Sequence, residues 1–336
     1  MERLRQITMG GTRREIGLFQ GRRVRDLRLP PLAAGDHAFG DACRAMVERW
    51  HPAIIGEFDG MLEASGLPED RFTSYYYGRT APLAGGCTNI AASAEAAAGG
   101  TTLVACNYDW AYADLRWCEA RLVAPAGEPR RIGYTHHWGG VCDVMNEEGL
   151  TVCIASLPPI KPTGPGLQWH IVVDLVVSRC RTASEAAHLI CGVPHVRSLS
   201  YLIADATTAR LVEASAARAA IVEPQAGILV ATNHRLGEEE DAGARGSFSV
   251  VRRRRALELL RPVVGRIGPE DLRRVLADHE GGICAGDHDD IRGRPSQHGR
   301  SGTIWSLLAA PAERTMQVAP GHPCTTPFER LPWPPA

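Results

Sequence analysis

The chain has 336 residues, of which 37 are Lys or Arg and 38 are Asp or Glu, so its formal net charge is −1. This length allows two average domains or one large layered domain, and a hydrophobic content of 44% excludes a disordered chain. The near-neutral charge offers no electrostatic basis for binding nucleic acid or an acidic membrane surface. We therefore expect a globular protein with neither partner.

Location is predicted from three absences in the sequence. Residues 1–6 lead into no apolar core of a secretory signal, and no stretch approaches the roughly 18 apolar residues needed to cross a bilayer. The 10 cysteines are scattered without a C-x-x-C pair, which is typical of a reduced protein whose thiols pack in the core. We expect a soluble, cytoplasmic protein.

The N-terminal part of the chain is expected to begin as a strand within the first 30 residues and then to become helical. Pro52 either begins a new helix or kinks the first one. Between residues 36 and 66, apolar residues recur at spacings of four and predict one buried helix face, made of Ala42, Met46, Trp50, Ile54 and Phe58.

Hairpins follow. The runs 87–93 and 101–107 read as two strands, with Cys87 at the first position. A second hairpin joins 141–145 to 150–155.

The rest of the chain alternates helices and strands. A helix is expected to begin at Thr182, whose hydroxyl caps it while Glu185 reaches back. The remaining expected elements are helices at 169–179, 249–261 and 270–279, strands at 200–204, 210–214 and 227–232, and a last hairpin of 303–309 with 315–319. This order predicts packed sheets covered by helices, an α+β arrangement, rather than one parallel sheet.

Several short motifs surround Cys87 and recur along the chain. A Gly-Cys pair alone carries no information, because about one is expected by chance in this composition. Together, however, the motifs resemble the penicillin acyltransferase-like family (isopenicillin N acyltransferase and its bacterial relatives) of N-terminal nucleophile hydrolases. They occur in the family's order between about residues 13 and 328: Gly86-Cys87-Thr88, Asn107-Tyr108-Asp109-Trp110, Asn146-Glu147-Glu148-Gly149-Leu150, Ala231-Thr232-Asn233-His234, Arg300-Ser301-Gly302-Thr303 and Gly321-His322-Pro323-Cys324.

The resemblance implies a four-layer αββα fold and self-cleavage between Gly86 and Cys87. The segments 1–86 and 87–336 would then share one domain and stay associated. A glycine before the cysteine removes side-chain crowding at the cut bond. Cys87 would carry a thiol and a new α-amine, whose ordinary pKa values near 8.5 and about 8 let the amine accept the thiol proton. The alternative for Cys87 is a buried core cysteine.

Three more residues match catalytic positions of the family. Asp109 would hold the amine or thiol in place; otherwise it caps exposed amides at the hairpin end. Asn233 would donate its NH₂ to a developing oxyanion, a contribution of about 3 kcal/mol; otherwise it is a turn residue. Arg300 would orient Asp109 or a substrate carboxylate, with Arg292 and Arg294 close by as alternatives.

A possible substrate pocket is suggested by His136, His137 and Trp138, since imidazoles beside an indole suit ligand contacts. The alternative is a partly buried strand edge. Four consecutive arginines, 252–255, are expected to form a solvated helix face that balances the acidic run 238–241.

Metal binding is not predicted. His279, Cys284 and the run His288-Asp289-Asp290 follow no standard zinc spacing and are ordinary for an exposed loop. We expect no metal and no cofactor.

The sequence thus predicts an autoproteolytic cysteine amidohydrolase or acyltransferase that forms a Cys87 thioester with a small acyl substrate. Water as acceptor gives hydrolysis and an amine gives transfer, and the sequence does not separate the two. The resemblance allows coenzyme A thioesters as donors, or small amides, since some relatives hydrolyse β-alanyl amides. Three alternatives stay open: an unprocessed thiol hydrolase activated by His234 or another histidine, a catalytically silent αββα binding protein, and a metal-dependent hydrolase.

Overall fold

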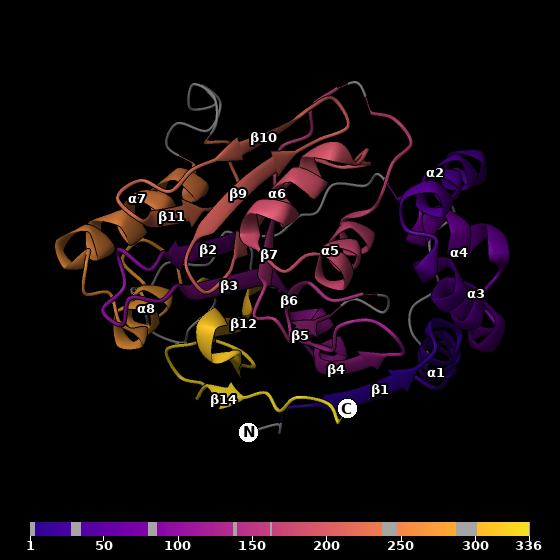
Figure 1. The fold of residues 1–336 in the computed structure, drawn as a ribbon, viewed down its shortest axis with the longest axis horizontal. Coiled ribbons are helices and arrows are strands. Elements are labelled where there is room, and N and C mark those ends of the chain that lie inside the picture. The colour runs from indigo at the N-terminus through magenta and orange to yellow at the C-terminus, as the bar shows by residue number, and fades with distance from the viewer. Residues whose placement is uncertain are drawn as a thin grey trace.

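Two β-sheets form the centre of the protein, and the chain returns to each of them several times (Figure 1). The computed structural model describes residues 4–27, 35–79, 86–136, 140–161, 163–236, 247–286 and 301–335. The sheets have eight strands in the order β1-β4-β5-β6-β7-β8-β9-β10 and six in the order β11-β2-β3-β12-β13-β14.

The strands are β1 (Gln6–Gly11), β2 (Gly86–Ala92), β3 (Leu103–Ala111), β4 (Glu119–Pro125), β5 (Arg131–Thr135), β6 (Asp143–Asn146), β7 (Thr151–Ser156), β8 (Leu199–Ala204), β9 (Ala209–Ala214), β10 (Ala219–Val222), β11 (Ile228–Ala231), β12 (Ser301–Ala310), β13 (Thr315–Ala319) and β14 (Glu329–Arg330). The helices are α1 (Arg13–Asp26), α2 (His37–Trp50), α3 (Ala53–Ser65), α4 (Glu69–Tyr76), α5 (Trp169–Arg179), α6 (Ala183–Gly192), α7 (Phe248–Leu260) and α8 (Pro269–Leu276), with short 3₁₀ helices η1 (Tyr112–Trp117), η2 (Arg261–Val263) and η3 (Pro311–Glu313).

The order of the layers is given by the elements that pack on each face of the two sheets. The two sheets contact each other through β2 against β7 and β8. Helices α5 and α6 pack on the eight-stranded sheet, while α7 and α8 pack on the six-stranded sheet. Because both faces of each sheet are covered, most strand residues are buried, whichever face their side chains point to. This is the expected αββα arrangement, and α1–α4 gather beside it (Figure 1).

Most expected elements between residues 86 and 319 are confirmed. The strands β2 and β3 pair antiparallel, as do β6 with β7, β8 with β9, and β12 with β13. The capping box of Thr182 and Glu185 begins α6, and Pro269 occupies the first turn of α8.

The strand expected within the first 30 residues is confirmed as β1, which ends at Gly11. Helix α1, which was not predicted, begins directly after Thr12, whose side chain forms a capping box with Glu15. The single apolar face expected between residues 36 and 66 is wrong in its first half. Pro52 does begin a new helix, but α2 buries Cys43 and Val47 rather than Ala42 and Met46. One stripe cannot run through both helices, because the break before Pro52 resets the helical phase.

The N-terminal segment is joined to the rest of the chain by a strand pairing and a buried ion network. Strand β1 pairs in parallel with β4. Arg13 Nη2 lies 2.8 Å from Asp174, Arg131 Nη2 lies 2.9 Å from the same carboxylate, and His51 Nε2 lies 2.8 Å from it. Burial alone would raise the pKa of Asp174, but the charges of Arg13 and Arg131 hold that pKa well below its usual range.

None of the helices described here combines the length and the apolar character that a membrane-spanning segment requires.

Asp174→Asn is expected to lower the free energy of unfolding by about 3–5 kcal/mol, because it leaves two buried guanidinium groups without their shared carboxylate. Urea denaturation of the uncut chain measures this. The matched control is Glu63→Gln, which breaks an ion pair with Arg14 between side chains that are 55% and 54% exposed, and costs about 1 kcal/mol or less. Equal effects of the two substitutions would contradict a structural role for the network.

Candidate active site

Cys87 lies near the start of β2, and both its amide N and its carbonyl O form hydrogen bonds with side chains. Its amide N donates to Asn233 Oδ1 at 2.8 Å, and the residue is 4% exposed. Across the ladder, Gly86 pairs with Asp109 and Cys87 with Tyr108. Because successive side chains alternate between the faces of a strand, the Cys87 thiol shares a face with Tyr108, and the Asp109 carboxyl lies on the Gly86 side.

The side chain of Asp109 closely approaches the backbone of Gly86. A Cβ at position 86 would lie 2.8 Å from Asp109 Oδ2 and 3.5 Å from Arg252 Nη2. Any larger residue would therefore push the carboxylate from its place. Glycine before Cys87 thus has a reason that lies in contacts with distant segments, and the sequence did not reveal it.

Asn233 follows β11 and bridges Cys87 to the other sheet. Its Oδ1 accepts from the Cys87 amide and, at 2.6 Å, from Arg252 Nη2. Its Nδ2 donates to Ser156 O at 3.0 Å and to Ser156 Oγ at 3.1 Å. Two donors on one side and a carbonyl acceptor on the other fix the orientation of the amide. In this uncut chain the NH₂ group faces Ser156, so donation to an oxyanion stays a prediction.

Arg252 is the site residue that the sequence analysis missed. The expected solvated arginine face is wrong at this position, since Arg252 is 7% exposed. Its guanidinium donates to Thr88 Oγ1 at 3.2 Å and to Cys87 O at 3.3 Å. The available signal was spacing: Arg252, Ala256 and Leu260 recur every four residues and are the buried residues of α7.

Asp109 places its carboxyl beside the backbone of Gly86. Thr303 Oγ1 donates to Asp109 Oδ1 at 2.7 Å, and the Ala285 amide donates to Thr303 Oγ1 at 2.9 Å. Burial raises the pKa of Asp109 to about 6, although the charge of Arg252 and the Thr303 hydrogen bond act to lower it. This carboxyl therefore changes charge close to neutral pH.

The Cys87 thiol is protonated at neutral pH in the uncut chain. Burial raises its pKa strongly, and the negative charges of Asp109 and Asp143 raise it further. The charge of Arg252 and the backbone amide of Asp109 lower the pKa, but by less. Nucleophilic attack therefore needs a group that removes the thiol proton.

The predicted pocket residues are only partly within the described chain. His136 Nε2 lies 2.9 Å from the hydroxyl of Tyr108, the cross-strand partner of Cys87. Its ring stacks on Trp110 with centroids 5.1 Å apart. Burial lowers the pKa of His136 to about 4, so the imidazole is neutral at pH 7.

The structure leaves several predicted residues outside the described ranges, namely His137, Trp138, Arg300, the alternatives Arg292 and Arg294, the acidic run 238–241 and the run His288-Asp289-Asp290.

His234, the base of the alternative thiol hydrolase, contacts α7. Its Nδ1 lies 2.8 Å from Ser249 Oγ and 3.0 Å from Thr232 Oγ1. Ser249 Oγ also accepts from the Asn233 amide at 2.7 Å. These contacts anchor the loop that carries Asn233.

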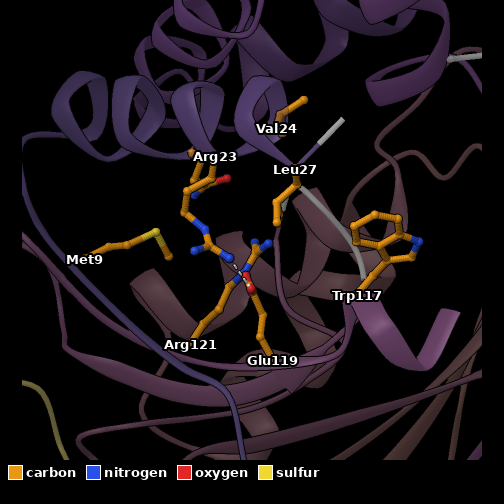
Figure 2. Close-up of a pocket in the computed structure, with 8 residues that line it drawn as sticks. Met9, Arg23, Val24, Leu27, Trp117, Glu119 and Arg121 are labelled. Atoms are coloured by element: carbon orange, nitrogen blue, oxygen red, sulfur yellow. Dashed lines mark hydrogen bonds and ion pairs between the residues drawn. The ribbon is translucent and has the colours of Figure 1, made fainter. Parts of the chain in front are cut away.

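A separate pocket lies between α1 and β4 (Figure 2). Glu119 is held there between two arginines: it pairs with Arg23, and its Oε1 lies 3.0 Å from Arg121 Nε. The two arginines thus share the one carboxylate of the pocket, and no predicted catalytic residue lines it. The lining residues are Met9, Gln20, Arg23, Val24, Leu27, Trp117, Glu119 and Arg121.

Residues 97–324, which are 228 of the 336, match the family described as acyl-coenzyme A:6-aminopenicillanic acid acyl-transferase. The chain belongs to this family. The resemblance inferred from its motifs is thereby confirmed. A search of curated proteins finds no match.

Solved structures of other proteins share the fold of this acyltransferase-family chain. An N-acylethanolamine-hydrolyzing acid amidase ortholog from Caenorhabditis elegans is 14% identical, covers 73% of this chain and all of its own, and gives a TM-score of 0.50. Penicillin V acylase from Agrobacterium tumefaciens is 13% identical over 73% of this chain and 86% of its own, with a TM-score of 0.50. The R18L variant of conjugated bile acid hydrolase from Clostridium perfringens is 12% identical over 74% and 97%, with a TM-score of 0.52.

These likenesses establish the fold as that of the N-terminal nucleophile hydrolases, an αββα sandwich. The matched family is one of acyl-transferring enzymes, and this supports an enzymatic role for the chain.

Gly86→Ala is expected to destabilise the uncut chain by about 1–3 kcal/mol, because the added methyl group overlaps the Asp109 carboxylate. Urea denaturation in a Cys87→Ala background, which lacks the thiol, measures the effect. The control is Gly192→Ala at the end of α6, where an added Cβ meets nothing within 4 Å. A change no larger than that of the control would show that Asp109 does not need glycine at position 86.

Proposed function

We propose that the chain cuts its own Gly86–Cys87 bond and then acts as an N-terminal-cysteine amidohydrolase or acyltransferase through a Cys87 thioester. One observation carries the proposal: the Cys87 nitrogen is held by Asn233 Oδ1 beside a buried guanidinium, and it follows a glycine that the Asp109 carboxyl approaches closely. Membership in the acyltransferase family supports the same chemistry.

Self-cleavage needs a proton acceptor other than the Cys87 nitrogen, which is still an amide. The thiol attacks the Gly86 carbonyl, the C–N bond breaks, and the thiol proton ends on the released nitrogen. Asp109 is suited to relay this proton, because its pKa is about 6 and it lies on the Gly86 side of the strand. Water then hydrolyses the thioester, leaving the Gly86 carboxylate and a free thiol.

After the cut, one residue supplies both the nucleophile and the base. The new α-amine accepts the thiol proton, the thiolate attacks the acyl carbonyl, and the same amine protonates the leaving group. Arg252 acts on this step through charge: a cation near the amine lowers its pKa and keeps more of it neutral. Asn233 Oδ1 holds one N–H of the amine, which directs the lone pair away from that contact.

The substrate class we propose is a small acyl amide, with a coenzyme A thioester as the alternative donor and no bound cofactor or metal in the chemistry. The structurally similar proteins are an acid amidase, an acylase and a bile acid hydrolase by name. Tyr108, Trp110 and His136 form an aromatic cluster on the thiol side of β2 and β3. We propose that this cluster contacts the acyl part of the substrate.

The two fragments are proposed to stay associated. Strand β1 belongs to the same sheet as β4 to β10. Arg13 and His51 on the first fragment share Asp174 with Arg131 on the second. Separation would expose this network and the sheet edge to water.

Denaturing mass spectrometry of the purified protein is expected to find two polypeptides, residues 1–86 and 87–336, while size-exclusion chromatography finds one complex. Cys87→Ala is expected to stay whole and inactive because it lacks the sulfur. Cys191→Ser, a half-buried thiol on α6, is the matched control and should be cut normally. A whole wild-type chain that hydrolyses acyl amides would instead support the unprocessed thiol hydrolase.

Arg252→Gln in the cut enzyme is expected to move the rising limb of the pH–activity profile about 1 pH unit upward. The neutral amine is the active form, so activity rises as the pH passes the amine's pKa, and loss of the neighbouring cation raises that pKa. The pH dependence of kcat/KM for an acyl-amide substrate measures the shift. Arg252→Lys, which keeps the charge, is expected to restore the wild-type limb; a uniform loss at all pH values would exclude the charge effect.

A further inference from the structure

Three side chains from distant parts of the chain, His279, Cys284 and Cys324, lie together, and His322 contacts one of them. Cys284 Sγ lies 3.7 Å from Cys324 Sγ and 3.9 Å from His322 Nδ1. His279 offers a ring nitrogen, and this atom and the two sulfurs all lie within 4.8 Å of one another. We call these four residues the Cys₂His₂ cluster.

The separation of the two sulfurs fits a tetrahedral zinc ion. Zinc–sulfur bonds of about 2.3 Å at tetrahedral angles place two sulfurs about 3.8 Å apart. The observed 3.7 Å between the Cys284 and Cys324 sulfurs agrees with that separation. Two thiolates would neutralise the charge of the ion, and two neutral imidazoles would complete the ligand set.

His322 is oriented as a metal-binding histidine. Its Nε2 lies 3.0 Å from the hydroxyl of Tyr112, so Nδ1 is the nitrogen that faces Cys284. Metal-binding histidines commonly use the second ring nitrogen in this way, which fixes the tautomer and the ring. The Tyr112 hydroxyl fits only because positions 286 and 302 are glycine: a Cβ there would lie 1.8 Å and 2.1 Å from it.

From these contacts we propose that the Cys₂His₂ cluster binds one structural Zn²⁺ ion. Binding releases the two thiol protons and forms four bonds, from Cys284, Cys324, His322 and His279. Because protein atoms fill all four positions, the ion would have no open site for substrate. The proposal departs from the expectation of no metal, which considered ligands only within residues 279–290, whereas His322 and Cys324 lie 38 and 40 residues after Cys284.

The ion would also be linked to the active site through the series of hydrogen bonds that holds Asp109. Asn107 Nδ2 donates to Ile283 O at 2.9 Å, and the Ala285 amide donates to Thr303 Oγ1. Thr303 in turn donates to Asp109. Cys284 stands between these two anchored positions, so its bond to zinc would fix the loop on which Thr303 depends.

Metal analysis of the full-length protein, expressed with zinc and purified under reducing conditions without chelator, tests the proposal without reference to activity. We expect about one zinc per chain. Replacement of zinc by Co²⁺ should give the thiolate charge-transfer band and the strong visible bands of tetrahedral cobalt, and this result needs no variant to fold. Cys284→Ser and Cys324→Ser should weaken both signals, whereas Cys191→Ser should keep them.

Tyr112→Phe separates a metal site from a chance cluster. Removing the hydroxyl that holds His322 should weaken zinc binding about 10–100-fold, measured by competition with a chromogenic chelator. Protein without zinc whose cobalt form lacks the thiolate band would overturn the proposal. So would a Cys284–Cys324 disulfide found by peptide mapping in protein prepared without reductant but with zinc present.

Discussion

The hydrogen bond from the Cys87 amide to Asn233 Oδ1 is the contact on which the site depends, and a buried cation fixes it. A guanidinium group that is removed from water needs hydrogen-bond acceptors for most of its N–H groups. Arg252 meets this demand with Asn233 Oδ1, Cys87 O and Thr88 Oγ1. The same charge therefore orients the asparagine, fixes the start of strand β2 and sets the electrostatics around the nitrogen of Cys87.

Each layer of the sandwich supplies part of this arrangement. Strand β3 brings Asp109 against Gly86, β12 brings Thr303 to Asp109, and α7 delivers Arg252 from the outer face. The eight-stranded sheet contributes Ser156, which binds the other end of the Asn233 amide. The site thus joins the two sheets at the start of β2. The loop of the Cys₂His₂ cluster contacts the site through the hydrogen bond from the Ala285 amide to Thr303.

Much of the scaffold was predictable because its signals are local. Turns, capping boxes and apolar runs lie within a few residues of the elements they start or end, as with Thr182 and Pro269. Strands β4 and β5 were missed because Glu119, Arg121 and Arg131 are buried in them as ion pairs, which hides the apolar pattern. Cys87, Asp109 and Asn233 came from motif resemblance, whereas the roles of Arg252 and Gly86 depend on contacts between distant segments that no local pattern encodes.

The central claim is that the nitrogen of Cys87 becomes a free amine. N-terminal sequencing of the purified protein by Edman degradation tests it most directly. The account predicts two sequences in equal amounts, one from the original start and one reading Cys-Thr-Asn-Ile-Ala from position 87. Active protein that yields only the original N-terminus, or only blocked chains, would contradict it.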